Sequence, residues 1–428
     1  MSAQPSSRRN FRHAPPFSCP RPRPLSLGLA GPGTVSAAPL ITVETAPGDD
    51  AAIIDGVKRT HAPDPRTKLF EVTAETSGGI TVLKGRTDSA EALSDLRAAY
   101  YVQKRPVDVR VKLLPDSDDL KKKVWAFTTA PVTRITDLSG RPVTTVPAGT
   151  PAARLDEKDG MTLLRLPDGS IGLARSTDVR PCTETEILIR NRHERLIVTA
   201  DKAVFKPLQE ESAPSADVVL PRGAVLRLDG AGDGVMRAAL PDGRRGTIAV
   251  SAVEKLADFE RREESERRSD PAAFMKALSE TAVREAASGR HADGGSFLRS
   301  VFLARDLIVQ RDPDMLLAAY PKADGGRSLD RFKPGDVLVF RPVNGVRAAG
   351  ISLGGSRFVS APDMGGDLRK GGAKARAALR KSLEGAVRID PGFLNDPCLT
   401  STRSNPYWQA PVKALVPCSR RADIEMIR

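Results

Sequence analysis

The chain has 428 residues, of which 40% are hydrophobic and 4% aromatic, a size that accommodates about two to four domains with apolar cores. No apolar run approaches the roughly 20 residues that a transmembrane helix requires, so a membrane-spanning segment is not expected. The net charge of +13 suits either solubility or attraction to an acidic polymer, and charge alone does not choose between them. With four Cys, none in a Cys-x-x-Cys pair, and four His, we expect neither a metal site nor a cofactor.

Residues 1–40 are rich in Pro and Arg and contain no acidic residue. A short apolar run, Leu25–Ala30, precedes Val35-Ser36-Ala37, whose small-x-small pattern is typical of a signal-peptide cleavage site. We interpret the segment as a degenerate secretory signal or as a disordered leader. The first interpretation predicts a periplasmic or extracellular protein, and the second predicts a cytoplasmic one.

Residues 41–120 are predicted to form a small α/β module. Phe70–Ala74 and Ile80–Leu83 alternate in polarity around a Ser-Gly-Gly turn, which predicts a hairpin. Ser89–Tyr101 has apolar residues at helical spacing, and Val107–Val111 alternates again. This order of strand, strand, helix and strand is weakly similar to the BON-type modules of bacterial envelope proteins.

An internal repeat with a period of about 74 residues spans residues 126–256. The first copy contains Val146-Pro147-Ala148-Gly149, Arg154-Leu155-Asp156, Asp159-Gly160 and Leu166-Pro167-Asp168-Gly169. The second copy contains Leu220-Pro221-Arg222-Gly223, Arg227-Leu228-Asp229, Asp233-Gly234 and Leu240-Pro241-Asp242-Gly243. Each Asp-Gly pair is a natural hairpin turn, because glycine accepts positive φ at no steric cost. Short strands with such close turns predict two small, strongly bent β-barrels.

The repeat resembles a tandem pair of bacterial SH3-like domains, predicted at residues 126–182 and 183–256. Members of that family usually have Gly-Trp before the central strand and Gly-Trp-Val after the hairpin. The corresponding positions here are Gly160-Met161, Gly172-Leu173-Ala174, Gly234-Val235 and Gly246-Thr247-Ile248. Because these aromatic residues often supply a ligand surface, their loss favours barrels that pack against the next domain and shape its groove. Direct binding to the cell wall is the alternative.

Residues 257–270 carry closely alternating charges, including Arg261-Arg262-Glu263-Glu264, which predict a solvated linker or a connecting helix. A nucleic-acid-binding helix is not expected, because the acidic residues nearly balance the basic ones and no aromatic residues interleave. Asp270-Pro271 then matches a helix N-cap followed by proline at the first helical position, which predicts a helix that continues over Ala272–Ala287.

The last region, residues 271–428, contains four motifs in a fixed order. They are Asp293-Gly294-Gly295-Ser296 at a helix start, Gln310-Arg311-Asp312-Pro313, the turn Lys333-Pro334-Gly335-Asp336 before the strand Val337–Phe340, and two strands at Ala348–Gly354 and Phe358–Ala361. This order resembles the NlpC-type cell-wall cysteine peptidases of bacteria. In that family a Cys stands at the helix start, a His opens a later strand, and a third polar residue follows. The resemblance implies a papain-like α+β fold for this domain.

The chemistry of that family is missing at its catalytic positions. The nucleophile position is Gly294, the base position is Ala348 and the third position is Ser360. In the family mechanism a thiolate at a helix N-terminus attacks and an imidazole transfers the proton, and neither glycine nor alanine can take these roles. We therefore expect no catalytic residue, and we favour an inactive protein over an enzyme.

Five residues are candidates to line the former substrate groove: Asp293, Ser296, His291, Ser360 and Arg311. For His291, simple exposure in a loop is the alternative. Cys398 and Cys418 are predicted either to form a disulfide in an oxidising compartment or to be two separate buried thiols, with a substitute nucleophile as a third interpretation. The aromatic pair Tyr407-Trp408 is expected to pack the tail against the core.

The fold class expected for the whole chain is α+β, with a small N-terminal α/β module, two SH3-like β-barrels and a papain-like NlpC-type domain. The resemblance implies a secreted cell-envelope protein that binds a peptidoglycan stem peptide or an envelope protein through the old groove. The alternative is an active peptidoglycan endopeptidase that cleaves the D-glutamyl-diamino-acid bond with an unrecognised nucleophile. No motif supports a third class, a basic nucleic-acid binder.

Overall fold

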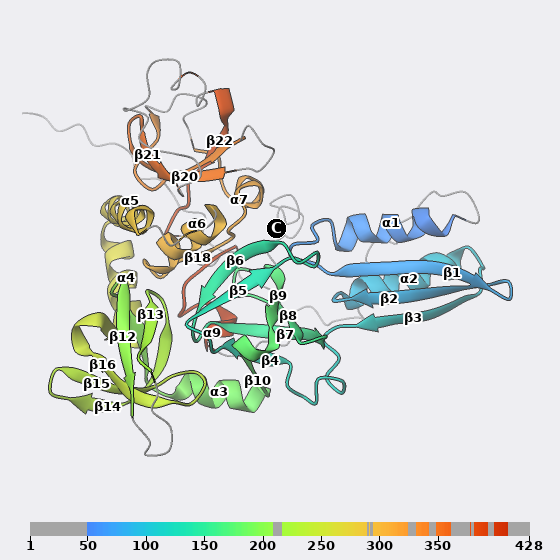
Figure 1. Ribbon diagram of the computed structural model, residues 1–428. Coiled ribbons are helices and arrows are strands. Elements are labelled where there is room, and N and C mark those ends of the chain that lie inside the picture. Colours follow the sequence, from blue (N-terminus) through green and yellow to red (C-terminus); the bar gives the residue numbers. More distant parts are fainter. Residues whose placement is uncertain are drawn as a thin grey trace, which may run out of the picture. The chain divides into compact units, whose positions relative to one another are not determined.

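The computed structural model describes residues 49–208, 216–288, 291, 294–323, 331–341, 348–360, 377, 381–392 and 398–409. All of them fall within one compact unit, Val43–Arg428. The described part of the chain is a mixed α+β structure with several separate sheets (Figure 1). No helix in this part is both long and apolar enough to cross a membrane. The predicted leader, residues 1–40, lies outside the described residues.

The N-terminal module has two helices packed on one face of a three-stranded sheet (Figure 1). Its elements are α1 (Asp50–His61), β1 (Phe70–Ser77), β2 (Ile80–Thr87), α2 (Ala90–Val102) and β3 (Val107–Leu113). The central strand β2 is antiparallel to β1 and parallel to β3. The predicted hairpin, helix and third strand are confirmed. The sequence analysis does not anticipate α1, whose N-cap Asp49 accepts a hydrogen bond from the Ala52 amide.

Two antiparallel seven-stranded sheets follow, here named β module 1 (residues 125–182) and β module 2 (residues 195–255). β module 1 contains β4 (Trp125–Thr128), β5 (Val132–Thr136), β6 (Pro142–Pro147), β7 (Pro151–Lys158), β8 (Met161–Arg165), β9 (Ile171–Arg175) and β10 (Val179–Cys182). β module 2 contains β11 (Arg195–Val198), β12 (Lys202–Pro207), β13 (Val218–Pro221), β14 (Val225–Gly232), β15 (Val235–Ala239), β16 (Arg245–Ala249) and β17 (Val253–Lys255). The strand orders are β10-β4-β7-β8-β9-β5-β6 and β17-β11-β14-β15-β16-β12-β13. Equivalent strands occupy equivalent places, so the sequence repeat corresponds to a repeated sheet.

The turns of the repeat have matching backbone conformations. Gly149 and Gly223 occupy equivalent turns and have φ angles of +82° and +83°. Gly169 and Gly243 occupy a second pair of equivalent turns, with φ angles of +82° and +100°. All four angles lie in the region that favours glycine, which explains why the repeat keeps glycine at these points.

Closed barrels, which the sequence analysis predicts, are not confirmed. Among the described residues, the outermost strands of each sheet do not pair with each other: β10 and β6 in β module 1, and β17 and β13 in β module 2. A register shift bends each sheet at equivalent points, in β7 and in β14. Side chains from all seven strands of β module 1 then meet in one core, namely Ala126, Ile135, Val146, Ala152, Leu164, Ala174 and Val179. The two modules are therefore strongly bent open sheets.

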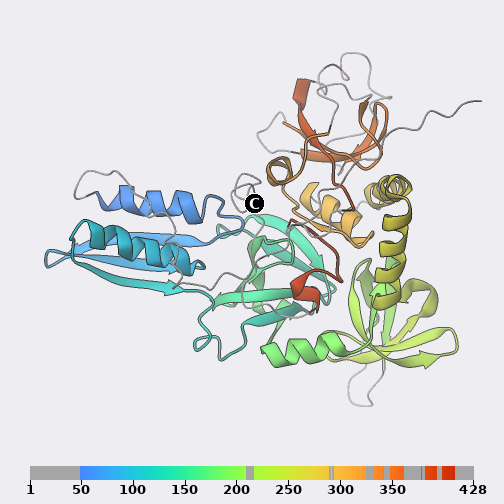
Figure 2. The same cartoon turned by 180° about the vertical axis from the view of Figure 1, so that it is seen from behind.

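Two helices extend from the β modules. Helix α3 (Glu184–Arg192) connects the modules and begins with a capping box, in which the Glu186 amide donates to Thr183 and the Thr183 amide donates to the Glu186 carboxylate. Helix α4 (Leu256–Ser269) runs from β module 2 to α5 (Pro271–Ala287), as Figure 2 shows. The predicted N-cap of α5 is confirmed, because Asp270 accepts hydrogen bonds from the amides of Ala272 and Ala273.

The charged segment at 257–270 is helical, but it is not solvated on all sides. Its buried residues include Phe259, Glu263 and Arg267, and Arg267 is only 2% exposed. The Glu263 carboxylate lies 3.1 Å from the Nε of Arg305. Arg305 lies in the turn that follows the helix Gly294–Leu303. Of the two alternatives, the connecting helix is confirmed. The solvated linker is wrong for this face, because helical spacing places several charged side chains on one side, where partners cover them.

The C-terminal domain packs helices against a four-stranded antiparallel sheet. After α5 its elements are α6 (Gly294–Leu303), β18 (Ile308–Val309), α7 (Pro313–Ala319), β19 (Val337–Phe340), β20 (Ala348–Gly354), β21 (Arg357–Ser360), β22 (Leu383–Val387), β23 (Leu399–Thr400) and α9 (Pro406–Gln409). The sheet has the order β21-β20-β19-β22, and β18 pairs with β23. Helix α6 and strands β19 and β20 contribute residues to the core of this domain, among them Phe297, Val301, Val337 and Ile351.

Asp306 lies in the turn after α6 and is only 1% exposed. Its carboxylate accepts hydrogen bonds from the amide and the hydroxyl of Thr402, at 2.9 and 2.6 Å. The same hydroxyl lies 2.9 Å from the carboxylate of Glu260. Burial raises the pKa of Asp306 to about 7, although the hydrogen bonds from Thr402 oppose this rise. Burial also raises the pKa of Glu260.

Stability is expected to fall as the pH rises from about 4 to 7, because folded Asp306 keeps a proton that the unfolded chain has already lost. Asp306→Asn should weaken this dependence and should stabilise the protein above pH 7 by up to a few kcal/mol, at about 1.4 kcal/mol per unit of pKa difference. Urea unfolding at several pH values measures this, with the exposed Asp118→Asn as the control. An unchanged pH slope in Asp306→Asn would contradict the assignment.

Candidate functional site

The start of α6 lies against β20 in the C-terminal domain. Gly294 is the first residue of α6, and a Cβ added to it would lie 3.5 Å from the backbone nitrogen of Ala349. That distance is an ordinary van der Waals contact, and no other atom is nearer among those considered. The position therefore has room for a Cβ, so a methyl side chain would not clash there.

Strand pairing brings the other two family positions to the same place. In the register of the sheet, Ala348 is opposite Phe340, and Gly350 is opposite Ser360. Ser360 therefore pairs with Gly350, which is two residues after Ala348 on β20. Gly294 lies beside Ala349, which is between these two residues in sequence. The three positions that the sequence analysis singles out are thus gathered around the start of β20.

Two of the gathered positions, Gly294 and Ala348, carry no group that can perform nucleophilic catalysis. Gly294 has no side chain, and alanine at position 348 has no atom that accepts a proton. Ser360 is half-buried, and Ser296 on α6 is only 2% exposed. A hydroxyl acts as a nucleophile only when a base lies within hydrogen-bonding reach. Asp293, the remaining acidic candidate, lies outside the described residues.

His291 lies in a loop, but its side chain is largely buried, so simple exposure, the alternative considered from the sequence, is wrong. Its side chain is 8% exposed, and its Nε2 lies 2.8 Å from a carboxylate oxygen of Glu285 on α5. The other oxygen of Glu285 lies 3.3 Å from the Nε of Arg222 in β module 2. The imidazole also packs edge-on against Phe297 at 5.9 Å between centroids. These contacts join α5, α6 and β module 2, which gives His291 a structural role.

Arg311 is also a structural residue in this arrangement. It is 5% exposed, and it donates a hydrogen bond of 2.8 Å to the carbonyl of Val143 in β module 1. Its guanidinium lies 3.3 Å from Asp312. Arg66, which precedes β1, donates to Asp314 at 2.7 Å. The motif around Arg311 thus holds the C-terminal domain against β module 1 and the segment before β1.

The cysteines offer no substitute nucleophile among the described residues. Cys182 is 2% exposed, and burial raises the pKa of its thiol to about 12, so the thiolate is not available near neutral pH. Cys398 is disulfide-bonded. The predicted partner, Cys418, lies outside the described residues. A disulfide favours an oxidising compartment, because cytosolic reductants keep most thiols reduced.

The aromatic pair in the tail packs the C-terminus against the rest of the unit, as expected. Trp408 is 2% exposed, and Tyr407 lies edge-on to Trp125 of β module 1 with ring centroids 5.5 Å apart. Asn405, just before α9, donates to the carbonyl of Pro167 at 2.9 Å. Among the described residues, no group of three or more His, Cys, Asp or Glu side chains could hold a metal ion.

Comparison with solved structures finds NlpC/P60 proteins. A family member from Bacillus cereus ATCC 10987 matches with a TM-score of 0.44 and 12% identity, over 62% of this chain and 100% of the other. A protein described as an NlpC/P60 endopeptidase from Photobacterium damselae subsp. piscicida gives a TM-score of 0.37 and 11% identity, over 58% and 62%. NlpC2 from Trichomonas vaginalis gives 0.29 and 12%, over 62% and 97%.

At these identities the likeness concerns the fold alone. The chain resembles NlpC/P60 proteins, as the order of its sequence motifs indicates. No protein-family model and no curated protein matches the sequence.

Proposed function

We propose that this is a catalytically inactive, NlpC-type protein of the cell envelope that binds a peptidoglycan stem peptide at the start of α6. The observation that carries the proposal is the meeting of Gly294 with β20, where the frame of a cysteine-peptidase site is built without a thiol or an imidazole. In this proposal β modules 1 and 2 are SH3-like modules that hold the C-terminal domain and shape its groove. The disulfide at Cys398 supports secretion, since it favours an oxidising compartment.

The chemistry at the start of α6 favours an anionic peptide. A helix N-terminus presents amide groups that have no partner within the helix, and it carries a partial positive charge. Glycine at positions 294 and 295 adds no side chain of its own over these amides. Stem peptides carry carboxylates, which such a helix start binds. The net charge of +13 adds a general attraction between this protein and acidic peptides.

Calorimetric titration with a purified wall tripeptide tests the binding proposal. Gly294→Phe should fill the space between α6 and β20 and weaken binding at least about tenfold, which corresponds to about 1.4 kcal/mol. Ala273→Phe, on the exposed first turn of α5, is the matched control and should bind as the wild type does. Equal binding by Gly294→Phe and the wild type would contradict the proposed site, provided that both have the same unfolding midpoint.

The alternative is an active endopeptidase with an unrecognised nucleophile. The buried thiol of Cys182 and the disulfide at Cys398 weigh against it. If the binding partner is an envelope protein instead of a stem peptide, the tripeptide should not bind, although Gly294→Phe should still abolish capture of that partner.

A further inference from the structure

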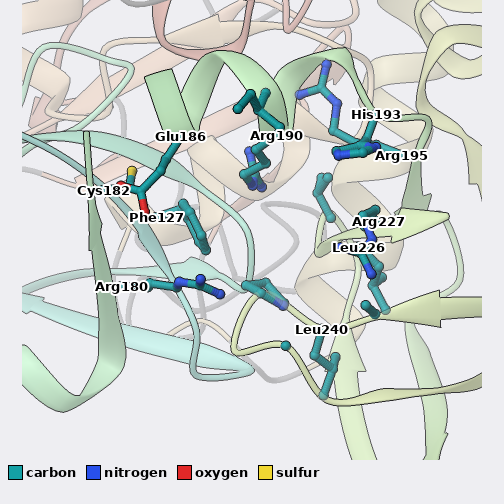
Figure 3. Close-up of a pocket in the computed structure, with 15 residues that line it drawn as sticks. Phe127, Arg180, Cys182, Glu186, Arg190, His193, Arg195, Leu226, Arg227 and Leu240 are labelled. Carbon is teal, nitrogen blue, oxygen red and sulfur yellow. The ribbon is translucent and has the colours of Figure 1, made fainter. Parts of the chain in front are cut away.

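A cavity lies between the two β modules, and its residues are far from the start of α6 in the sequence. Its volume is about 250 Å³, and strands β4, β10, β11 and β14 line it together with α3. Figure 3 shows Phe127, Arg180, Arg190, Arg195, Leu226 and Leu240 around this cavity. Both copies of the repeat contribute, so the cavity exists only where the two modules are joined by α3.

Three of the arginines in the cavity form no ion pair with a carboxylate among the described residues. Arg190 donates to the carbonyl of Gly149 at 2.7 Å, and Arg195 donates to the carbonyl of Trp408 at 3.2 Å. Both arginines also donate to the side-chain oxygen of Asn191, at 3.3 Å each. Arg180 is exposed, and its guanidinium lies 5.8 Å from the ring centroid of Phe127. These hydrogen-bond partners are neutral. The carboxylates of Glu186 and Glu260 act on Arg180 and Arg195 without forming an ion pair with them among the described residues, so the positive charge is only partly compensated.

The other charged groups at the cavity are already engaged. Arg227 is paired with Asp229 at 2.7 Å. Glu186 accepts the Thr183 amide in the capping box of α3. Burial lowers the pKa of Arg195, and the negative charge of Glu260 opposes this shift. The Glu260 carboxylate itself lies within hydrogen-bonding distance of the Thr402 hydroxyl.

The arginines also repel one another. Burial and, to a smaller extent, the charge of Arg195 together lower the pKa of Arg190 to about 9. Burial likewise lowers the pKa of Arg195. Arginine still keeps its proton at neutral pH, so the cavity holds like charges that are only partly solvated. An anion in the cavity would relieve both the repulsion and the loss of hydration.

The rest of the cavity wall is mainly apolar. Phe127 lies between the guanidinium groups of Arg180 and Arg190, with the latter 4.8 Å from the ring centroid. Val225, Leu226 and Leu240 from β module 2 complete the apolar surface. Binding sites for drug-sized ligands commonly have volumes of roughly 300–1,000 Å³, so this cavity suits a smaller molecule.

We propose that the cavity between β modules 1 and 2 binds a small organic oxyanion, with its phosphate or carboxylate on Arg180, Arg190 and Arg195 and its apolar part on Phe127 and Leu240. Guanidinium groups bind either anion through paired N–H donors, so both have the required chemistry. The apolar wall selects an anion with a hydrophobic group over a free inorganic ion. This site is independent of the one proposed at α6.

Phenyl phosphate and benzoate are the probes that test this site, because each joins a small ring to one of the two anions. Calorimetry with the full chain should detect binding of at least one of them, and inorganic phosphate should bind more weakly than phenyl phosphate. Tighter binding of phenyl phosphate would indicate that the natural ligand is a phosphate ester, and tighter binding of benzoate would indicate a carboxylic acid. No binding of either probe at millimolar concentration would overturn the proposal.

Variants locate the binding. Arg190→Gln should weaken binding of the tighter-binding probe at least tenfold, because one charge-assisted contact between guanidinium and anion is lost. Since Arg190 also holds the Gly149 carbonyl, Arg180→Gln is the second variant, and it should weaken binding several-fold without loss of stability. Arg192→Gln, on the exposed surface of α3 and outside the cavity lining, is the matched control and should bind normally. Binding that neither Arg190→Gln nor Arg180→Gln weakens would overturn the assignment. Gly294→Phe should not affect probe binding, which separates this proposal from the first.

Discussion

Replacing Gly149 with alanine is expected to destabilise the protein by about 3–4 kcal/mol, one of the largest effects of any single methyl group in this chain. The φ angle of +82° accounts for about 1–2 kcal/mol of this loss. The remainder comes from a steric clash, because the added Cβ would lie 2.2 Å from the carbonyl oxygen of Val225. The backbone cannot easily move away, since the Val225 amide donates to the Ala148 carbonyl at 2.9 Å. The substitution should therefore also loosen the contact between the two β modules.

Gly169→Ala is the matched control for this prediction. Its φ angle is also +82°, but no atom lies within 4 Å of the position of an added Cβ. It should cost only the conformational part, about 1–2 kcal/mol. Urea unfolding of both variants gives the difference directly. Equal losses in the two variants would show that the Gly149 turn does not form the tight contact with Val225.

Asp336→Ala is expected to destabilise the C-terminal domain by about 3 kcal/mol, because it removes a buried carboxylate that pairs with the half-buried Arg388. The Asp336 side chain is 2% exposed and accepts two hydrogen bonds from Arg388, at 2.9 and 2.7 Å. It also accepts the amide of Lys333 at 2.8 Å, which closes the turn before β19. The substitution removes all three hydrogen bonds.

Asp390→Ala is the control, because Asp390 is exposed and accepts only the Gly392 amide, at 2.9 Å, among the hydrogen bonds found for it. Its cost should stay below about 1 kcal/mol. Thermal or urea unfolding, followed by tryptophan fluorescence, compares the two variants. A loss in Asp336→Ala no larger than that in Asp390→Ala would contradict the role assigned to the turn.

Local rules account for the parts of the fold that the sequence predicts correctly. The repeat is visible because Gly149 and Gly223 must have positive φ, and such positions tolerate few other residues. The start of α5 is visible because Asp270 caps it and Pro271 suits the first helical position. The order of the motifs along the chain predicts that Gly294, Ala348 and Ser360 lie close together, and the strand pairing places them so.

Long-range contacts decide the parts that the sequence analysis misses. Charged residues such as Glu263 and Arg267 are typical of an exposed helix, but in the structure they are buried on the face of α4 that packs against the C-terminal domain. His291 is largely buried because Glu285 on α5 and Phe297 on α6 lie beside it. The cavity between the β modules escapes notice because its arginines come from three separate elements. The spacing of Arg190 and Arg195 around the end of α3 is its only signal in the sequence, and it does not by itself distinguish a cavity from a surface.

The most direct test of the central claim is to incubate the purified wild-type protein with wall tripeptide and tetrapeptide fragments. Mass spectrometry then follows cleavage, and calorimetry follows binding in the same mixtures. The absence of a thiol at position 294 and an imidazole at position 348 predicts binding without cleavage. Cleavage that persists in highly purified protein would contradict the account, because it requires a nucleophile other than a thiol at position 294.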